Sequence, residues 1–346
     1  MRILIATVYE IYGGSTKVLL ASAEALRAEF KVTLRAPFDN ASSRSKLTFP
    51  SRSISTFAEK LGALPLLFRL LTAEIGYVAR NRPDVIYVHD TPSLIVYGLI
   101  ARLFRLRVVY HVHGSEGSGL NLWLRNFLTD CKLYVAHFLV DPSWPGPSFL
   151  IDNPIPAPRV TMRDRTPARR LYLAGSISDR KNQILAVEIL AEMRRRGHDA
   201  KLHLCGPIFD KAYVARLETA IRTLGMSEHV LLEGVRPMEE IYDRADVVLC
   251  PSRYEAQPLV FLEALAGGVP VVVSRIAAHS EIVEKTGLNA GTILAELTAR
   301  SFADCIERLE PNYFAGMKGH VATLYAPQHF ATKLVEIFRE FAHKME

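Results

Sequence analysis

Short apolar segments alternate with amphipathic, helix-like segments from the first residue of the chain, and no other feature limits its fold as strongly. When a strand, a helix and a second strand follow one another, the strands pair in parallel and the helix covers one face of the sheet. The pattern therefore predicts a doubly wound α/β domain. Its expected strands are 2–8, 31–35, 84–89, 107–112 and 133–140, and its expected helices are 16–29, 57–80, 92–104 and 120–129.

A run of prolines interrupts this alternation between residues 141 and 167. Prolines at this density fit neither a helix nor a strand, so we interpret the run as the connection between two domains. The alternation then starts again, and 346 residues exceed what one hydrophobic core usually organises. The sequence thus predicts two Rossmann-like doubly wound domains, at 1–165 and 166–326. The second should contain strands 170–174, 200–205, 229–233, 246–250 and 269–273 and helices 181–196, 210–224, 237–243, 258–267 and 278–285.

Positive charge is concentrated in the first of these domains. Residues 1–165 contain 20 Lys and Arg against 13 Asp and Glu, a net charge of +7, whereas the remainder contains 22 against 23, a net charge of −1. A basic half is attracted to an anionic membrane surface, but the same charge can also have no other role than to keep the protein soluble. Nucleic acid is not an expected partner, since the chain has no nucleic-acid-binding motif and no dense basic cluster interleaved with aromatic residues.

The chain is expected to cross no membrane. Its first residues, MRILIATVYE, form a short apolar run with no cleavage site after it, which indicates a buried strand rather than a signal peptide. Arginines interrupt the longest apolar segments before they reach transmembrane length. The four cysteines are far apart without metal-ligand spacing, which indicates reduced thiols. We therefore expect a cytoplasmic protein that can lie peripherally at the inner face of a membrane.

The stretch EAQPLVFLEALAGGVPVVV, from Glu255 to Val273, carries the clearest functional signal. Glu255 stands just before a helix that begins with proline, and Glu263 lies within that helix. Two glycines end the helix, and a β-branched strand of the buried parallel type follows. The amino end of a helix favours anions, while carboxylates accept hydrogen bonds from hydroxyls. A sugar nucleotide suits this arrangement, but two glutamates near one helix also occur as solvated or capping residues.

The segment PSRYEAQPLVFLEALAGGVPVV, residues 251–272, resembles the donor-site signature of retaining glycosyltransferases with the GT-B fold, the family 4-like "glycosyl transferases group 1". In that signature a glutamate, seven residues and a second glutamate precede an alanine-rich helix end and Gly-Val-Pro-Val. The resemblance implies two Rossmann-like domains facing each other across a cleft, the first on the acceptor side and the second for the nucleotide sugar. It also implies that the C-terminal helix, about 327–346, packs back on the first domain.

Two places in the first domain match functional positions of the resembled family. Gly13 and Gly14 follow the first strand and precede a helix, where glycines let a ligand approach the backbone. The family has a glycine-rich loop here, close to the donor phosphates and the acceptor. His113 ends the strand VVYHVHG, and the family places a histidine after this strand, near the transferred sugar. His111 faces the same side one step deeper, and His89 ends the preceding strand in a similar way.

The resemblance also implies a cationic site for the donor diphosphate, in the string GSISDRKN. The family pattern is Gly-Arg, a few residues, then Lys-Gly, and its lysine neutralises the charge that develops on the diphosphate as the sugar departs. Gly175 and Lys181 match the glycine and the lysine of this pattern. Both are therefore expected to bind the donor, and Lys181 is expected to support catalysis.

Two residues of the same string depart from the family pattern. Ser176 occupies the arginine position, and Asn182 occupies the position of the second glycine. One cation is therefore missing, unless Arg180 or Arg253 supplies it. The departure leaves open reduced activity, an altered donor, or a chain that binds the donor without transferring the sugar.

The helix after Glu255 completes the expected donor site. Pro258 has no N–H group to give a phosphate, so the amides of Leu259 and Val260 are the candidates for the diphosphate. By its place in the signature, Glu255 is assigned to the transferred sugar and Glu263 to the ribose hydroxyls. No Asp-x-Asp or His/Asp cluster stands where a diphosphate would need a metal ion. We expect neither a metal nor a cofactor besides the donor substrate.

The sequence thus predicts an enzyme that moves a hexose from a nucleotide diphosphate sugar to a hydroxyl acceptor with retention of configuration. Glu255, His113 and Lys181 are the expected catalytic residues. The acceptor would be a glycan or a lipid-linked polysaccharide precursor, and UDP and GDP donors both remain open. The alternatives are a non-catalytic nucleotide-sugar-binding subunit and a GT-B-fold nucleotide-sugar epimerase, against which the Ala-Gly-Gly-Val-Pro end of the signature argues.

Overall fold

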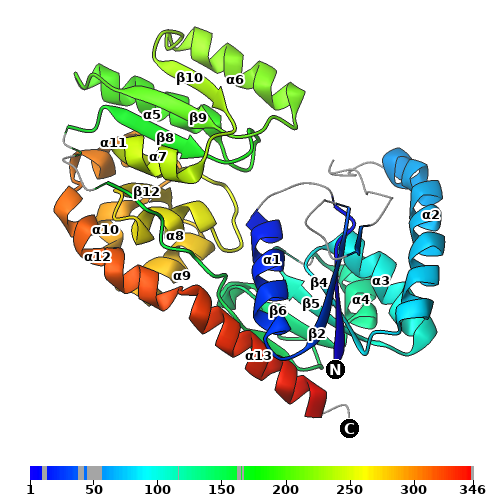
Figure 1. Ribbon diagram of the computed structural model, residues 1–346. Coiled ribbons are helices and arrows are strands. Elements are labelled where there is room, and N and C mark those ends of the chain that lie inside the picture. The colour runs from blue at the N-terminus through cyan, green and yellow to red at the C-terminus, as the bar shows by residue number, and fades with distance from the viewer. Residues whose placement is uncertain are drawn as a thin grey trace. The chain divides into compact units, whose positions relative to one another are not determined.

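The chain forms two compact units, each with its own parallel sheet and hydrophobic cores (Figure 1). Unit 1 contains Met1–Pro154 together with Pro327–Glu346, and unit 2 contains Ile155–Ala326. Both are α/β units of Rossmann type, which confirms the predicted fold class. The structure is a computed structural model, and it describes residues 1–9, 14–37, 43–44, 57–115, 117–161, 165 and 167–343.

The sheet of unit 1 has the strand order β3-β2-β1-β4-β5-β6-β7, and its described neighbours pair in parallel. The chain starts inside the sheet, builds outward to one edge, and then returns to build the other side. This reversal creates a switch point between β1 and β4, where ligands of such sheets bind. The strands are β1 (Arg2–Ala6), β2 (Lys31–Ala36), β3 (Ser43–Arg44), β4 (Val85–Val88), β5 (Arg107–Val112), β6 (Cys131–Tyr134) and β7 (Ser148–Leu150).

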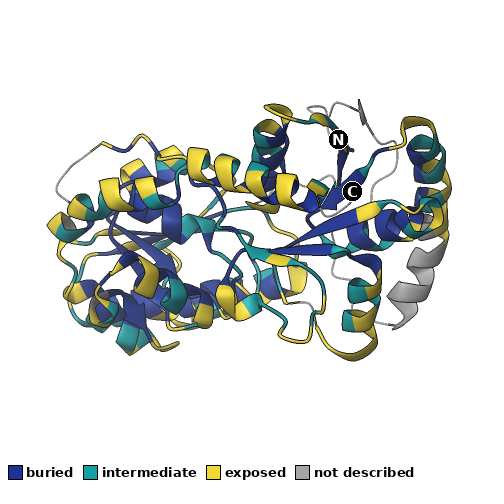
Figure 2. Cartoon of the chain, turned by 90° about the horizontal axis from the view of Figure 1, so that it is seen from below, coloured by how far each residue is buried: buried dark blue, intermediate teal, exposed yellow. Residues whose placement is uncertain are grey.

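Helices cover both faces of this sheet, so its strands are apolar on both sides and form the buried layer in Figure 2. On one face, α1 and α13 pack against Ile5, Leu34 and Val109. On the other face, α2, α3 and α4 pack against Leu4 and Ile86. The helices are α1 (Gly14–Arg27), α2 (Phe57–Asn81), α3 (Thr91–Phe104), α4 (Gly119–Leu128) and α13 (Pro327–His343), with a short 3-10 helix η1 (His137–Leu139).

Unit 2 repeats this plan with the strand order β10-β9-β8-β11-β12-β13, again with parallel pairs among the described strands. Its switch point lies between β8 and β11. The internal strands are buried along their length because helices cover both faces of the sheet. The strands are β8 (Arg170–Ala174), β9 (Lys201–Cys205), β10 (Val230–Gly234), β11 (Val247–Cys250), β12 (Val271–Ser274) and β13 (Leu294–Ala295).

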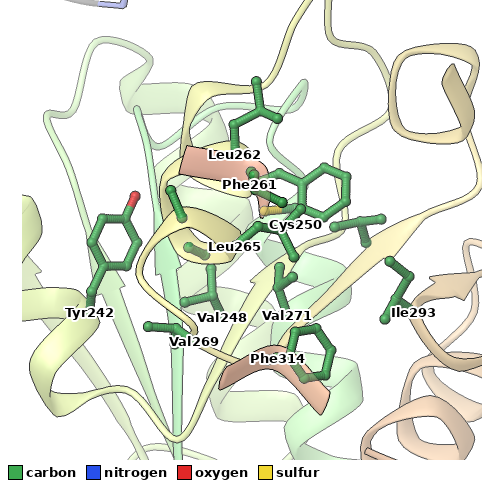
Figure 3. Close-up of a cluster of buried hydrophobic side chains, with 14 of the residues drawn as sticks. Tyr242, Val248, Cys250, Phe261, Leu262, Leu265, Val269, Val271, Ile293 and Phe314 are labelled. Atoms are coloured by element: carbon green, nitrogen blue, oxygen red, sulfur yellow. The ribbon is translucent and has the colours of Figure 1, made fainter. Parts of the chain in front are cut away.

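One face of the unit 2 sheet is covered by α5 (Gln183–Arg195), α6 (Lys211–Thr223) and α11 (Ala299–Glu307). The other face holds α8 (Leu259–Ala266), which is buried from Phe261 onward. Figure 3 shows its Phe261 and Leu265 packed with Val271 of β12 and Phe314. The remaining helices on that face are α7 (Met238–Arg244), α9 (Ala277–Thr286), α10 (Ala290–Ile293) and α12 (Pro311–Leu324).

The proline-dense segment contains structure that the sequence analysis did not predict. Ser148–Leu150 forms β7, the edge strand beside β6, and Lys132 N donates to Pro147 O at 3.1 Å. An edge strand tolerates neighbouring prolines because one of its sides needs no ladder donors. The expected strand 133–140 was also wrong, since β6 ends at Tyr134 and η1 follows. In addition, α11 and α12 were not predicted.

The two units divide after Pro154, whereas the sequence analysis placed the boundary at 165/166. Ile155 N donates to Tyr325 O at 2.9 Å, and Val160 packs in the core around α8. The chain therefore joins unit 2 before its first strand begins. At the other end, α13 belongs to unit 1 because its apolar side chains lie in the same core as β1.

Truncation of a core side chain of α13 should destabilise unit 1. Phe338 is fully buried and contacts Tyr87 edge-on, with ring centroids 5.2 Å apart. Phe338→Ala should lower the free energy of unfolding by about 3–5 kcal/mol, measured by calorimetry. Phe68→Ala, at an exposed site in α2, is the control and should change it little. Equal effects of the two substitutions would show that α13 does not pack in this core.

Candidate active site

The carboxyl edge of the unit 2 sheet gathers most of the predicted donor-binding residues. Gly175 and Lys181 lie in the loop between β8 and α5, and Glu255 lies in the loop between β11 and α8. Because β8 and β11 flank the switch point, these two loops leave the same edge of the sheet side by side. Residues far apart in sequence thereby reach one another.

Glu255 is the centre of this group. Its carboxylate is 2.7 Å from Lys181 Nζ and 2.6 Å from Arg180 Nη1, one cation on each oxygen. Ser252 Oγ donates a hydrogen bond of 2.9 Å to the oxygen that Lys181 contacts. Only 7% of the Glu255 surface is exposed, so the charge is compensated by these partners and little by water.

These partners keep Glu255 ionised. Burial by itself would raise the pKa of Glu255, but the charges of Lys181 and Arg180, with hydrogen bonds from Lys181 and Ser252, lower it to about 2. The carboxylate therefore stays negative at neutral pH. It can accept hydrogen bonds from a ligand's hydroxyl groups or stabilise a positive charge, but it cannot act as a general acid there.

Gly175 determines where Lys181 can lie. Its φ of +145° is a conformation that side-chain-bearing residues rarely adopt, and a Cβ atom at this position would stand 2.8 Å from Lys181 Cε. The glycine thus makes room for the lysine stem on its way to Glu255. This close approach is the physical reason for a glycine at the place the sequence analysis assigned to donor binding.

Asn182 explains one departure from the family pattern. It occupies the expected second glycine position and has φ +59°, in the left-handed region that glycine and asparagine tolerate best. Its Nδ2 also donates to Pro251 O at 3.2 Å, which ties the two loops of the switch point together. Arg253 contacts Asp179 and the side chain of Asn182, whereas Arg180 is the arginine that reaches Glu255.

Glu263 lies deeper, on α8. It is 6% exposed and accepts a hydrogen bond of 2.7 Å from the hydroxyl of Tyr242 on α7. Burial first, and then the Glu263 carboxylate, raise the pKa of Tyr242, which therefore remains a hydroxyl donor. Both glutamates of the signature thus avoid bulk water, but they lie in different hydrogen-bond groups.

The amino end of α8 presents the backbone of Leu259 and Val260. Pro258 is the N-cap residue of this helix, and its side chain makes no capping hydrogen bond. Both residues are partly buried. Their amides are therefore placed as a helix N-terminus requires for binding an anion, in the same loop-to-helix segment as Glu255.

Unit 1 holds the remaining predicted residues. Gly13 lies outside the described residues, and Gly14 begins α1. His113 follows β5 and is partly buried, and its Nε2 is 3.1 Å from Nδ1 of His89. Burial lowers the pKa of His113 to about 3, so its imidazole is neutral at physiological pH.

Gly175, Arg180, Lys181 and Glu255, which the sequence analysis assigned to donor binding, lie together in the structure, but sequence reasoning missed the residues that support them. Ser252 lies inside the quoted signature, three residues before Glu255, and this spacing was a readable signal for a hydrogen bond. Tyr242 carried no such signal, because it comes from another helix and reaches Glu263 only through the packing of α7 on α8.

Removal of the Glu255 charge should destabilise unit 2 in a pH-dependent way. Because its folded pKa of about 2 lies below the ordinary 4.5, the stabilisation is complete above about pH 4.5 and is lost as the pH falls toward 2. Glu255→Gln should cost of the order of 3 kcal/mol at pH 7, or roughly 5–10 °C in the calorimetric midpoint. The difference from the wild type should shrink below pH 4.5. The exposed Glu228→Gln serves as the control, and a difference that does not depend on pH would contradict the assignment.

Comparison with known sequences connects both halves of the chain to one family. The sequence profile of "Glycosyl transferases group 1" matches residues 164–317, and that of "Glycosyltransferase Family 4" matches residues 12–138. The first match contains the Glu255 group and α8, and the second contains the β1–α1 loop and His113.

Individual relatives align over shorter stretches. The GDP-mannose-dependent alpha-(1-6)-phosphatidylinositol monomannoside mannosyltransferase of Mycolicibacterium smegmatis is 36% identical over 120 residues, 31% of each chain. The alpha-D-kanosaminyltransferase of Streptomyces kanamyceticus is 27% identical over 175 residues, 48% of this chain and 44% of the relative. The chain thus matches 31% of the length of the first of these curated relatives and 44% of the second.

Solved structures share the fold over nearly the whole chain. HepE of Anabaena, in complex with UDP and glucose, has a TM-score of 0.76 at 18% identity and covers 98% of this chain and 100% of its own. The sucrose-phosphate synthase of Thermosynechococcus elongatus has a TM-score of 0.80 at 16% identity, with 99% of each chain covered. With the two family matches and the two Rossmann-like units, these similarities show that the chain belongs to the family 4-like glycosyltransferases of the GT-B fold.

Proposed function

We propose that this protein transfers a hexose from a nucleotide diphosphate sugar to a hydroxyl acceptor with retention of configuration. The observation that carries the proposal is the buried Glu255 carboxylate between Lys181 and Arg180 at the unit 2 switch point. A nucleotide sugar offers the complementary groups, because its diphosphate is anionic and its sugar carries hydroxyls. In this proposal the acceptor is a glycan or a lipid-linked polysaccharide precursor.

The two cations are suited to the leaving group. As the bond between the sugar and the diphosphate breaks, negative charge grows on the phosphate oxygens, and positioned cations lower the energy of that state. Lys181 and Arg180 are already held in place by Glu255, so the site needs little rearrangement when the charge develops. Glu255 accepts hydrogen bonds from the sugar hydroxyls, and the amides of Leu259 and Val260 bind the diphosphate. By its match to the family pattern, His113 of unit 1 is assigned to the transferred sugar.

The position of Arg180 favours a site that transfers the sugar over a site that only binds the donor. Ser176 stands where the family has an arginine, which would leave Lys181 as a single cation. Arg180 lies 2.6 Å from the same carboxylate that Lys181 contacts, so a second positive charge stands beside the lysine despite Ser176. A catalytic site with two cations is therefore the proposal, rather than a binding subunit or an epimerase.

The relatives support both candidate bases of the donor. The mannosyltransferase relative is GDP-mannose-dependent by name, whereas HepE was solved with UDP and glucose and with UDP-glucose. The proposal therefore covers both UDP- and GDP-hexoses.

We also propose that the protein works at an anionic membrane surface, through α3 and α4. Five large apolar side chains are exposed on these two helices: Leu99, Leu103, Leu120, Trp123 and Phe127. We call this set the α3/α4 face. No helix among the described residues is long and apolar enough to cross a membrane, so this face would bind at the interface instead.

The two helices of the α3/α4 face pack directly against each other. Trp123 and Phe127 stack one helical turn apart, with ring centroids 5.5 Å apart, while Leu128 faces inward. Leu128 packs so closely on Gly98 of α3 that a Cβ at Gly98 would stand 2.8 Å from Leu128 Cβ. The two helices therefore present one apolar surface, and patches of this kind usually have a partner.

The charge around the α3/α4 face favours binding to anionic lipid. Residues 91–130 contain four arginines, at 102, 105, 107 and 125, and two acidic residues, Glu116 and Asp130. Asp130 pairs with Arg102 and Arg107, and a net positive charge remains. Arg105 and Arg107 are exposed, and the Arg102 guanidinium lies 5.8 Å from the Phe127 ring centre. Arginines beside exposed Trp, Phe and Leu are the composition of helices that lie in the interface of anionic bilayers.

Donor binding and transfer should both depend on the Glu255 group. UDP- or GDP-hexose should raise the unfolding midpoint of the wild type by a few degrees, because a ligand of the folded state stabilises it. Lys181→Met should weaken this binding at least tenfold, whereas Lys201→Met, at an exposed site in β9, should not. Glu255→Gln should reduce acceptor-dependent nucleotide diphosphate release by about 100-fold or more. Full turnover in that variant would overturn the assignment, and tight donor binding without transfer in the wild type would favour a binding subunit.

Membrane binding should depend on the α3/α4 face. The wild type should sediment with vesicles that contain phosphatidylglycerol and much less with pure phosphatidylcholine. The double variant Leu120→Ser/Trp123→Ser should reduce the partition coefficient at least tenfold, since each side chain loses about 1–2 kcal/mol of apolar burial. Leu232→Ser/Val235→Ser is the matched control, because these side chains are also exposed but lie in unit 2. Equal losses in both variants would contradict the proposal.

A further inference from the structure

Three histidines meet at the carboxyl edge of the unit 1 sheet. Val88 of β4 is paired with Tyr110 of β5, so His89 and His111 come next at the same level. His113 lies two residues beyond His111 and therefore on the same face of the sheet. The ring centroids of His111 and His113 are 4.2 Å apart, and those of His89 and His111 are 4.8 Å apart. We call these three residues the histidine cluster.

The hydrogen bonds of His111 determine which of its nitrogens carries the proton. Its Nδ1 is 2.7 Å from the hydroxyl oxygen of Tyr87, and its Nε2 is buried without a hydrogen-bond partner in the described structure. A buried N–H group without an acceptor is rarer in proteins than a buried nitrogen that lacks a donor. The proton therefore belongs on Nδ1, which leaves Nε2 unprotonated, with a lone pair that accepts no hydrogen bond.

His89 has the same arrangement. Its Nδ1 is 3.1 Å from His113 Nε2, and its Nε2 is buried without a partner among the described residues. The same argument assigns the proton to Nδ1, as the donor to His113, and leaves His89 Nε2 bare. The interior therefore holds two unprotonated imidazole nitrogens, Nε2 of His89 and Nε2 of His111, beside the ring of His113.

We propose that the histidine cluster binds one divalent transition-metal ion of the Zn²⁺ and Co²⁺ class, through one ring nitrogen each of His89, His111 and His113. Each histidine offers a ligand atom, and these three atoms lie within 4.8 Å of one another. Nitrogens around a tetrahedral ion with bonds of 2.0–2.1 Å lie roughly 3.4 Å apart, so they need to approach by at most about 1.4 Å. Small rotations of the rings suffice for this.

The chemistry of the ligands selects the class of ion. Three neutral imidazoles suit Zn²⁺, Co²⁺, Ni²⁺ or Cu²⁺, whereas Mg²⁺ and Ca²⁺ require oxygen ligands that the cluster does not supply. Tyr87 already orients His111 through Nδ1, as the outer partners of metal-binding histidines do. The sequence analysis expected no metal because it looked for ligands of a diphosphate-bound ion, and it did not consider these three histidines, which come from the ends of two strands, as one site.

A metal ion bound to the histidine cluster should inhibit the proposed transfer reaction. Coordination would take a ring nitrogen of His113 and replace its hydrogen bond with His89, and so turn the ring away from its present position. Added Zn²⁺ should therefore inhibit transfer, and EDTA should restore it. This consequence rests on the proposed function, but binding of the ion does not, so the two are tested separately.

The test uses the full chain, free of affinity tags and treated with EDTA, and the probes Co²⁺, Zn²⁺ and Mg²⁺. One equivalent of Co²⁺ should give the visible absorption bands of a low-coordinate site, and Zn²⁺ should raise the unfolding midpoint by about 5 °C. Mg²⁺ should do neither. His113→Gln and His89→Asn should each weaken Zn²⁺ binding at least 100-fold, whereas His320→Gln, at an exposed site in α12, should leave it unchanged.

Two results would overturn the proposal. One is the absence of a stoichiometric Co²⁺ spectrum and of Zn²⁺ stabilisation in the wild type. The other is Zn²⁺ binding that survives in His113→Gln, which would place the ion elsewhere. His113 is only partly buried, so this variant should fold even if His89→Asn does not. Zn²⁺ binding without any transfer activity would support the site and contradict the proposed function alone.

Discussion

Parallel pairing of the strands is the constraint on which the rest of this structure depends. In both sheets the described strands run in one direction, so all their carboxyl ends, and the loops that leave them, lie on one edge. The strand order reverses between β8 and β11, so the loops that follow these two strands lead away from each other. Residues of these loops that lie near the strand ends nevertheless stay side by side. Gly175, Lys181 and Glu255 meet there. In unit 1 the parallel pairing of β4 with β5, away from the switch point, brings His89 and His111 together. Neither group could form if these strands were antiparallel neighbours.

A buried charge is the second determinant of the candidate site. Glu255 would be costly in the interior by itself, and it stays ionised because Lys181, Arg180 and Ser252 contact it. The same contacts hold the two cations at fixed positions. A diphosphate that enters this region thus finds charges already in place, and the electrostatic work of arranging them is done on folding. Stability and the proposed catalysis therefore rest on the same side chains.

The two candidate sites differ in how their buried polar groups are satisfied. At the unit 2 site the carboxylates have donors around them, and the Tyr242 hydroxyl satisfies Glu263. In unit 1 the histidine cluster leaves two nitrogens without partners in the described structure, and these two lie beside a third imidazole. Buried polar atoms are seldom left unpaired without a functional reason. The proposed ion site therefore lies in unit 1, while the proposed donor site lies in unit 2.

The sequence by itself determined the two Rossmann-like units and the family, because strand and helix periods and the Glu255–Val273 signature are local patterns. It offered both Arg180 and Arg253 as substitutes for the arginine missing at Ser176, and only the structure shows that Arg180 is the one that reaches Glu255. It did not predict β7, because proline density conceals an edge strand, nor Tyr242 and the pairing of His89 with His113. Those depend on which strands and helices become neighbours. Contacts between distant segments follow from packing and strand order, and only the tertiary structure decides them.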